Sequence, residues 1–214
     1  MDKDSVTPRG TSAAGSRSVC PVVLAGGLSS RMGRDKALLK LPYGETLLAR
    51  ARNLLTTLPP PAGVEFMPVL VSGARPGGVP DRVPEVGPLG GLQAIARHLQ
   101  EEGRDCDALL VIPVDMPLLG RGELRTLCAA GQSVEQAVCF GDFYLPAWLP
   151  LNARTRRYLD AAVVGDAIAS IRALYGFLGC MQLPVPQGDW HLNANQPDDF
   201  IRIARLARGE TSEK

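Results

Sequence analysis

The chain has 214 residues, of which 45% are hydrophobic and 21% are charged, and this composition is typical of one soluble domain with a sizeable core. Its formal net charge of +1 gives no overall attraction to a polyanion, so we expect neither nucleic acid nor a membrane as a partner. The five cysteines include no Cys-x-x-Cys pair and only two histidines are present, so we expect reduced thiols, no structural zinc site and a cytoplasmic location.

The two ends of the chain have the composition of unstructured segments. Residues 1–18 are rich in Ser, Thr and Gly and lack the apolar run of a secretion signal, so we expect a disordered N-terminal extension. Residues 209–214 are expected to form a flexible tail. A single domain is therefore expected over residues 19–208.

The first element is an apolar, β-prone run at residues 19–24, followed by Ala25, Gly26 and Gly27. The two glycines allow the backbone to turn and to bring its N–H groups close to a ligand, and Arg31 and Lys36 then supply positive charge. The spacing is neither the dinucleotide-binding pattern nor the Walker pattern. We interpret the segment as a phosphate-binding loop, with an ordinary tight strand-to-helix connection as the alternative.

Strands and helices are expected to alternate in the first half of the chain. The pattern predicts a helix at 46–58, a strand at 64–71, a helix at 90–100 and a strand at 108–114. The strand at 108–114 is nearly all apolar, as in a central parallel strand buried on both faces. This order favours an α/β, three-layer, Rossmann-like fold, in which a mainly parallel sheet carries helices on both faces.

Three polar features follow three of the expected strands: the glycine loop, Ser72 and Asp115. Ligands of parallel sheets bind beyond the carboxyl ends of the strands, so we expect these features to converge. A carboxylate in that position suits Mg²⁺, which takes one or two carboxylates together with phosphate oxygens and water. Alternatively, Asp115 caps a local turn or the next helix.

The second half of the chain has a weaker pattern. We expect a strand at 136–140, a helix at 152–164, a helix at 166–177 with Asp166 as its N-cap, and a strand at 180–185. A final helix is indicated by Pro197 in its first turn and by Asp198 and Asp199 near its positive dipole end.

Several short motifs, taken in order, resemble those of the molybdenum cofactor guanylyltransferases of the nucleotidyltransferase superfamily. The motifs are Leu24-Ala25-Gly26-Gly27, Arg31-Met32-Gly33, Asp35-Lys36, Gly87-Pro88-Leu89-Gly90-Gly91-Leu92, Asp115-Met116-Pro117 and Asn193-Ala194-Asn195-Gln196-Pro197-Asp198. The resemblance covers about residues 19–206 and implies a nucleotidyltransferase fold. It also implies that GTP reacts with molybdopterin carrying molybdenum to give the guanine dinucleotide cofactor and pyrophosphate.

The resemblance implies a role for each matching residue. The nucleotide-binding positions are Leu24, Ala25, Gly26, Gly27, Arg31, Lys36, Ser72, Asp81, Gly87, Pro88, Leu89 and Asp115. Lys36 contacts phosphate, Asp115 holds Mg²⁺, and Asp81 matches a family aspartate that precedes the Gly-Pro-Leu motif. Asn193 and Asn195 are candidates for binding the substrate, although Asn195 also suits the N-cap of the final helix.

Nucleotidyl transfer is a displacement at the α-phosphorus, which positioning and charge neutralisation accelerate without a covalent protein intermediate. We therefore expect Arg31, Lys36 and Asp115 to carry the catalysis. Alternatives are a cytidylyltransferase acting on the same substrate, a sugar-phosphate nucleotidyltransferase, or a non-catalytic adaptor that carries nucleotide or cofactor. Gly26-Gly27 favours GTP, because relatives that use CTP tend to resemble Leu-Ala-Ala-Gly. Molybdoenzymes or cofactor chaperones are expected as transient partners.

Overall fold

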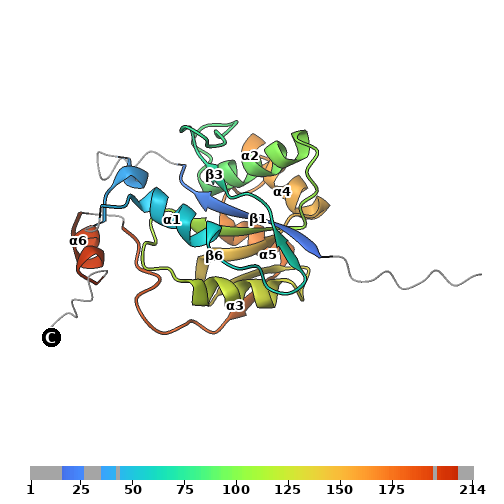
Figure 1. Cartoon of the computed structure of the whole chain (residues 1–214). Helices are drawn as coiled ribbons and strands as arrows, with labels where there is room; N and C mark the ends of the chain where they lie inside the picture. The colour runs from blue at the N-terminus through green and yellow to red at the C-terminus, as the bar shows by residue number, and fades with distance from the viewer. Residues whose placement is uncertain (1–15, 27–34, 42–43, 195–196, 207–214) are drawn as a thin grey trace, which may run out of the picture.

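The computed structural model describes residues 16–26, 35–41, 44–194 and 197–206. Within these ranges the chain forms three layers, in which one sheet lies between two sets of helices (Figure 1). The α/β three-layer fold predicted from the sequence is confirmed. The first strand begins at Arg17, so Arg17 and Ser18 belong to the sheet and not to the expected N-terminal extension. The rest of that extension and the expected tail lie outside the described residues.

The sheet is mainly parallel, as expected. Its strands in the described chain are β1 (Arg17–Leu24), β2 (Val64–Phe66), β3 (Leu70–Ser72), β4 (Ala108–Pro113), β5 (Ala137–Phe140), β6 (Phe143–Pro150) and β7 (Cys180–Leu183). Their spatial order is β2-β1-β4-β6-β5-β7, and β3 also pairs with β1. Only β6 runs antiparallel to its neighbours β4 and β5, and the other pairings in the described chain are parallel.

Helices bury both faces of the sheet. On one face lie α1 (Leu47–Thr56), α3 (Arg121–Gly131) and α6 (Pro197–Leu206), and on the other lie α2 (Pro88–Glu101), α4 (Ala153–Val164) and α5 (Ile171–Leu178). In β4, Leu110 and Ile112 belong to the first core, and Leu109 and Val111 belong to the second. The strand is apolar at consecutive positions because both of its faces are covered.

The expected strand at 64–71 is wrong in one detail, because it is divided into β2 and β3. The two pieces pair with successive parts of β1, and Met67 still donates its N–H to the carbonyl of Val19 at 2.8 Å. The break falls at Pro68, which has no N–H to continue the ladder. The chain therefore leaves the sheet for a few residues and returns to end β3 at Ser72, beside the end of β1.

The helix expected at 166–177 begins later, at Ile171, and its N-cap is Ser170 and not Asp166. The Ser170 hydroxyl accepts a hydrogen bond from the N–H of Ala173 at 3.1 Å. Asp166 instead closes the preceding helix, because its N–H donates to the carbonyl of Ala161 at 2.9 Å after the left-handed Gly165.

Strand β6 is absent from the sequence expectation, although it lies between β4 and β5. Its two prolines are typical of positions outside a central strand. Residues 147–150 nevertheless pair with β4, and the register against β5 shifts between Val138 and Phe140, opposite the part of β6 that contains Pro146. The prolines are tolerated because one ends the strand and the other lies where the ladder is irregular.

No helix within the described ranges is both long and apolar enough to cross a membrane.

Candidate active site

The carboxyl ends of β1, β3 and β4 meet at one edge of the sheet. Leu24, at the end of β1, pairs with Ser72 of β3 on one side and with Pro113 of β4 on the other. The N–H of Val114 donates to the carbonyl of Leu24 at 3.0 Å, which places Asp115 immediately beyond this junction. The predicted convergence of the glycine loop, Ser72 and Asp115 is therefore confirmed.

Ser72 supports the start of the loop from inside the protein. Its side chain is 1% exposed, and its hydroxyl accepts a hydrogen bond from the N–H of Ala25 at 3.4 Å. Gly73 follows with a φ of +115°, and a Cβ added there would lie 3.2 Å from the carbonyl oxygen of Ala25 and from the nitrogen of Gly26. The two backbones approach each other closely because neither glycine has a side chain. Ser72 is thus placed to shape the loop, and its predicted contact with nucleotide stays a prediction.

Lys36 and Asp115 lie side by side at this edge. The Lys36 Nζ is 3.5 Å from Asp115 Oδ2, and the two side chains are 18% and 21% exposed. Lys36 opens a short 3₁₀ turn, η1 (Lys36–Leu38), whose N-cap is Asp35, since the Asp35 carboxylate accepts the N–H of Ala37 at 3.0 Å. A half-buried cation next to a half-buried carboxylate suits the binding of a phosphate together with its counter-ion.

The carboxylate of Asp81 is enclosed by glycines. A Cβ on Gly26 would lie 3.6 Å from Asp81 Oδ1, and a Cβ on Gly90 would lie 3.4 Å from Oδ2. Burial raises the pKa of Asp81 above its ordinary value. Oδ1 is buried and has no hydrogen-bond partner within the described part of the chain. An acceptor without a donor at the edge of the sheet suits a ligand contact, as the sequence predicts for Asp81.

The Gly-Pro-Leu motif forms the start of α2. Gly87 is the N-cap with a φ of +73°, and Pro88 is the first helical residue, where its missing N–H costs no hydrogen bond. Leu89 is fully buried, so only its backbone can reach a ligand. The free N–H groups of this first turn favour an anion or a polar group.

The segment before α6 is attached directly to Asp115. The N–H of Ala194 donates to the Asp115 carbonyl at 2.8 Å. In this segment Asn193 Oδ1 and His191 Nδ1 are buried and have no hydrogen-bond partner among the described residues. Trp190 anchors the segment by packing its ring 5.3 Å from those of Phe140 and Phe143. The structure thus brings Asn193 into the neighbourhood of Asp115, as expected for one site.

Three predicted site residues, Gly27, Arg31 and Asn195, lie outside the described residues. Two others, Gly73 and Arg75, lie at the edge but were missed by the sequence reasoning. Arg75 donates hydrogen bonds to the carbonyl of Ala25 and to the carboxylate of Asp35. The signal that could have found them is their position: a glycine and a cation follow the end of β3, as Gly26 and Lys36 follow the end of β1.

A metal at this edge would have Asp115 as its protein ligand. No group of three or more His, Cys, Asp or Glu side chains gathers into a metal site in the described ranges. This donor set suits Mg²⁺, which commonly binds through one or two carboxylates and completes its shell with phosphate oxygens and water. It does not suit Zn²⁺, which needs three or four protein ligands.

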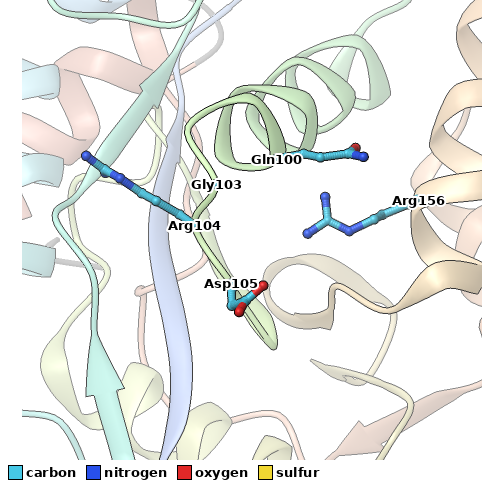
Figure 2. Close-up of a pocket in the computed structure, with 5 residues that line it drawn as sticks. All are labelled: Gln100, Gly103, Arg104, Asp105 and Arg156. Atoms are coloured by element: carbon cyan, nitrogen blue, oxygen red, sulfur yellow. The ribbon is translucent and has the colours of Figure 1, made fainter.

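A pocket elsewhere on the molecule does not compete for the phosphate role (Figure 2). It is lined by Gln100, Gly103, Arg104, Asp105 and Arg156, at the C-terminal end of α2 and ahead of β4. This is the opposite end of the sheet from Asp115. Arg104 is paired with Glu102 at 3.0 Å, and Arg156 donates to the carbonyl of Ala96 at 2.8 Å. Both guanidinium groups therefore already have protein partners.

Comparison with known proteins agrees with this geometry. A family model described as the MobA-like NTP transferase domain matches residues 21–178. A molybdenum cofactor guanylyltransferase of Xanthomonas euvesicatoria pv. vesicatoria (strain 85-10) is 40% identical over 187 residues, which are 85% of this chain and 92% of that protein. A second protein of that name, from Rhizobium meliloti (strain 1021), is 37% identical and covers 71% of this chain and 72% of its own.

Solved structures with low sequence identity share the fold. The molybdopterin-guanine dinucleotide biosynthesis protein A of Archaeoglobus fulgidus has a TM-score of 0.67 at 20% identity, covering 89% of this chain and 99% of its own. The 2-C-methyl-D-erythritol 4-phosphate cytidylyltransferase of Thermus thermophilus has a TM-score of 0.59 at 20% identity, covering 87% and 98%. The shared fold therefore does not distinguish between nucleotide bases.

Proposed function

The chain belongs to the family of MobA-like NTP transferase domains and is a nucleotidyltransferase; we propose that it transfers GMP from GTP to molybdopterin carrying molybdenum, with release of pyrophosphate. The observation that carries this proposal is the 3.5 Å approach of Lys36 Nζ to Asp115 Oδ2, immediately beyond the end of β1. This edge presents backbone N–H groups, a cation and a carboxylate in one place, which is what a nucleoside triphosphate and its counter-ion require.

The protein's part in the reaction is positioning and charge neutralisation. The backbone of Ala25 and Gly26 and the ammonium of Lys36 are placed to hold phosphate oxygens, which lowers the repulsion that an attacking phosphate meets at the α-phosphorus. The terminal phosphate of molybdopterin is ionised at neutral pH and is the attacking group, so the enzyme needs no general base for this step. Pyrophosphate leaves with the bonding electron pair.

Mg²⁺ is proposed as the cofactor, and Asp115 is the residue that would hold it. When bound, Mg²⁺ supplies additional neutralisation of charge on the phosphate oxygens. Asp81 is proposed to contact the nucleotide, because its buried Oδ1 has no hydrogen-bond donor within the described ranges.

Asn193 is proposed to contact the pterin substrate, together with Asn195. Asn193 precedes Ala194, which is hydrogen-bonded to the Asp115 backbone, and its buried Oδ1 has no partner in the described part of the chain. An amide can both donate to and accept from the polar edge of a pterin ring. Loss of this amide should raise the KM for molybdopterin more than the KM for GTP.

The decisive experiment compares Asp115→Asn with Asp105→Asn, a matched control in which the exposed aspartate at the opposite end of the sheet is changed. Purified proteins are given GTP, Mg²⁺ and molybdenum-loaded molybdopterin, and dinucleotide is measured. We expect Asp115→Asn to lose about 100-fold or more in turnover and the control to match wild type. Turnover of Asp115→Asn at the level of the control would remove Asp115 from the mechanism.

Two alternatives give different results in the same assay. A titration of all four nucleoside triphosphates tests the base, and a preference for CTP would replace the guanylyltransferase by a cytidylyltransferase. An adaptor would show no turnover in the wild-type protein yet would still deliver cofactor to a recipient apo-enzyme after the Asp115 change. A cytoplasmic location and transient contact with molybdoenzymes or cofactor chaperones are proposed with the enzymatic function, and the five unpaired cysteines agree with a reducing compartment.

A further inference from the structure

Arg75 links the two segments that flank the glycine loop. One of its terminal nitrogens donates to the carbonyl oxygen of Ala25, and the other lies 3.4 Å from Asp35 Oδ2. In the sequence, Ala25 and Asp35 stand on either side of residues 27–34, which include the predicted site residues Gly27 and Arg31. A single guanidinium therefore joins the end of β1 to the turn that carries Lys36.

The backbone around Arg75 is fixed by a closed turn after β3. The N–H of Arg75 donates to the carbonyl of Gly73, and the N–H of Gly78 donates to the carbonyl of Arg75, both at 2.9 Å. A Cβ on Gly78 would lie 2.8 Å from Cγ of Arg75, so the side chain emerges through a place that only glycine leaves open. The guanidinium thus reaches the loop from a rigid base.

Stability alone gives a weak reason for this arrangement. The Arg75 side chain is only 13% exposed, whereas its partner Asp35 is 45% exposed, and pairs with such solvent access contribute little. The Arg75 Nε is buried without a hydrogen-bond partner in the described ranges, which is a cost to folding. Buried polar groups kept at such a cost are found more often where function requires them.

The geometry points to a function through the peptide between Ala25 and Gly26. In a planar trans peptide the C=O and N–H groups point in opposite directions. Because the Ala25 carbonyl is directed to Arg75, the N–H of Gly26 is directed to the other side of the peptide. The second contact acts on Asp35, whose carboxylate caps the turn that begins with Lys36. Arg75 thereby constrains both the loop backbone and the phosphate-binding lysine.

We propose that Arg75 is a positioning residue for nucleotidyl transfer, which orients the Gly26 N–H and the Lys36 ammonium toward the triphosphate by holding Ala25 and Asp35. The inference rests on the proposed function, since it assumes that this edge binds a nucleoside triphosphate. Arg75 acts through these neighbours and not by direct contact with the reacting atoms.

The test separates charge from geometry with Arg75→Lys and Arg75→Met. Lysine keeps the positive charge but cannot bind the carbonyl and the carboxylate with a rigid fork. Arg104→Met is the matched control, because it removes the same charge at the opposite end of the sheet (Figure 2). GTP affinity is measured by calorimetry at a temperature well below every melting temperature, and kcat and KM follow from dinucleotide formation.

We expect Arg75→Lys to weaken GTP binding by about tenfold and to lower kcat, and Arg104→Met to leave both unchanged. Asp35→Asn should have a similar effect, and combining it with Arg75→Met should add little, because both changes break the same link. Arg75→Lys with wild-type GTP affinity and kcat would overturn the proposal, as would fully multiplicative effects of the Arg75 and Asp35 changes. Arg75→Lys and Asp35→Asn carry the test if Arg75→Met does not fold.

Failure of the proposed function gives a different result. If wild type binds GTP but forms no dinucleotide with any acceptor, the assigned reaction is wrong, while the GTP affinities of the variants still test Arg75. If wild type binds no nucleoside triphosphate, both proposals are overturned.

Discussion

Gly91 allows α2 to lie directly against the end of β3, and filling this contact should destabilise the protein. A Cβ at Gly91 would lie 2.9 Å from the Oγ and 3.1 Å from the Cβ of Ser72, and 3.4 Å from a methyl group of Leu24. Ser72 is fully buried and cannot move into solvent. The change Gly91→Ala must therefore displace either the helix or the serine that supports Ala25.

The expected magnitude is the sum of three effects. Alanine in place of glycine favours the helix by about 1 kcal/mol. Overpacking of the contact costs about 1–3 kcal/mol. Weakening the hydrogen bond between the Ala25 N–H and the Ser72 hydroxyl costs about 1 kcal/mol more. The net expectation for Gly91→Ala is a loss of about 1–3 kcal/mol in the free energy of unfolding.

Urea unfolding followed by circular dichroism measures this loss, with Gly176→Ala as the matched control. Gly176 lies in α5 with nothing within 4 Å of its added Cβ, so this variant should gain up to about 1 kcal/mol. Gly91→Ala should also bind GTP more weakly, because Ser72 supports the loop. A Gly91→Ala protein as stable as the Gly176→Ala protein would refute the argument from close helix packing.

Two further predictions concern the buried thiols. Burial raises the pKa of Cys128 from 9.0 to about 12. Between these values the unfolded chain loses a proton that the folded chain keeps, so the free energy of unfolding should fall as pH rises across this window, by up to about 4 kcal/mol. Urea midpoints of wild type and Cys128→Ala over this range check it, and equal slopes would contradict it. The Cys139 thiol, with its sulfur 3.3 Å from that of Cys180, lowers the pKa of Cys180 by hydrogen bonding. Iodoacetamide should therefore label Cys180 before Cys139, and mass spectrometry showing the reverse order would disprove this.

The parts of the fold that the sequence predicts well are those dictated by local pattern. Strand β4 is recognisable because both of its faces must be apolar, and α1 because its apolar residues follow helical spacing. The junction of Leu24, Ser72 and Asp115 follows in turn, since parallel strands place their carboxyl ends at one edge.

The parts that the sequence does not predict depend on contacts between distant segments. Strand β6 contains prolines that are acceptable only because of where its register shifts against β5. The enclosed position of Asp81 depends on Gly26 and Gly90, which belong to other elements. Arg75 carries no periodic signal, because its role comes from two partners far away in the chain.

The hydrogen bond from Ala194 to the backbone of Asp115 has a consequence for how the protein is made. In the order of synthesis, Ala194 comes after α3, β5, β6, α4, α5 and β7. A nascent chain that already contains Lys36 and Asp115 therefore still lacks the strap that anchors the aspartate. The ribosome must deliver nearly the whole domain before the nucleotide edge is complete.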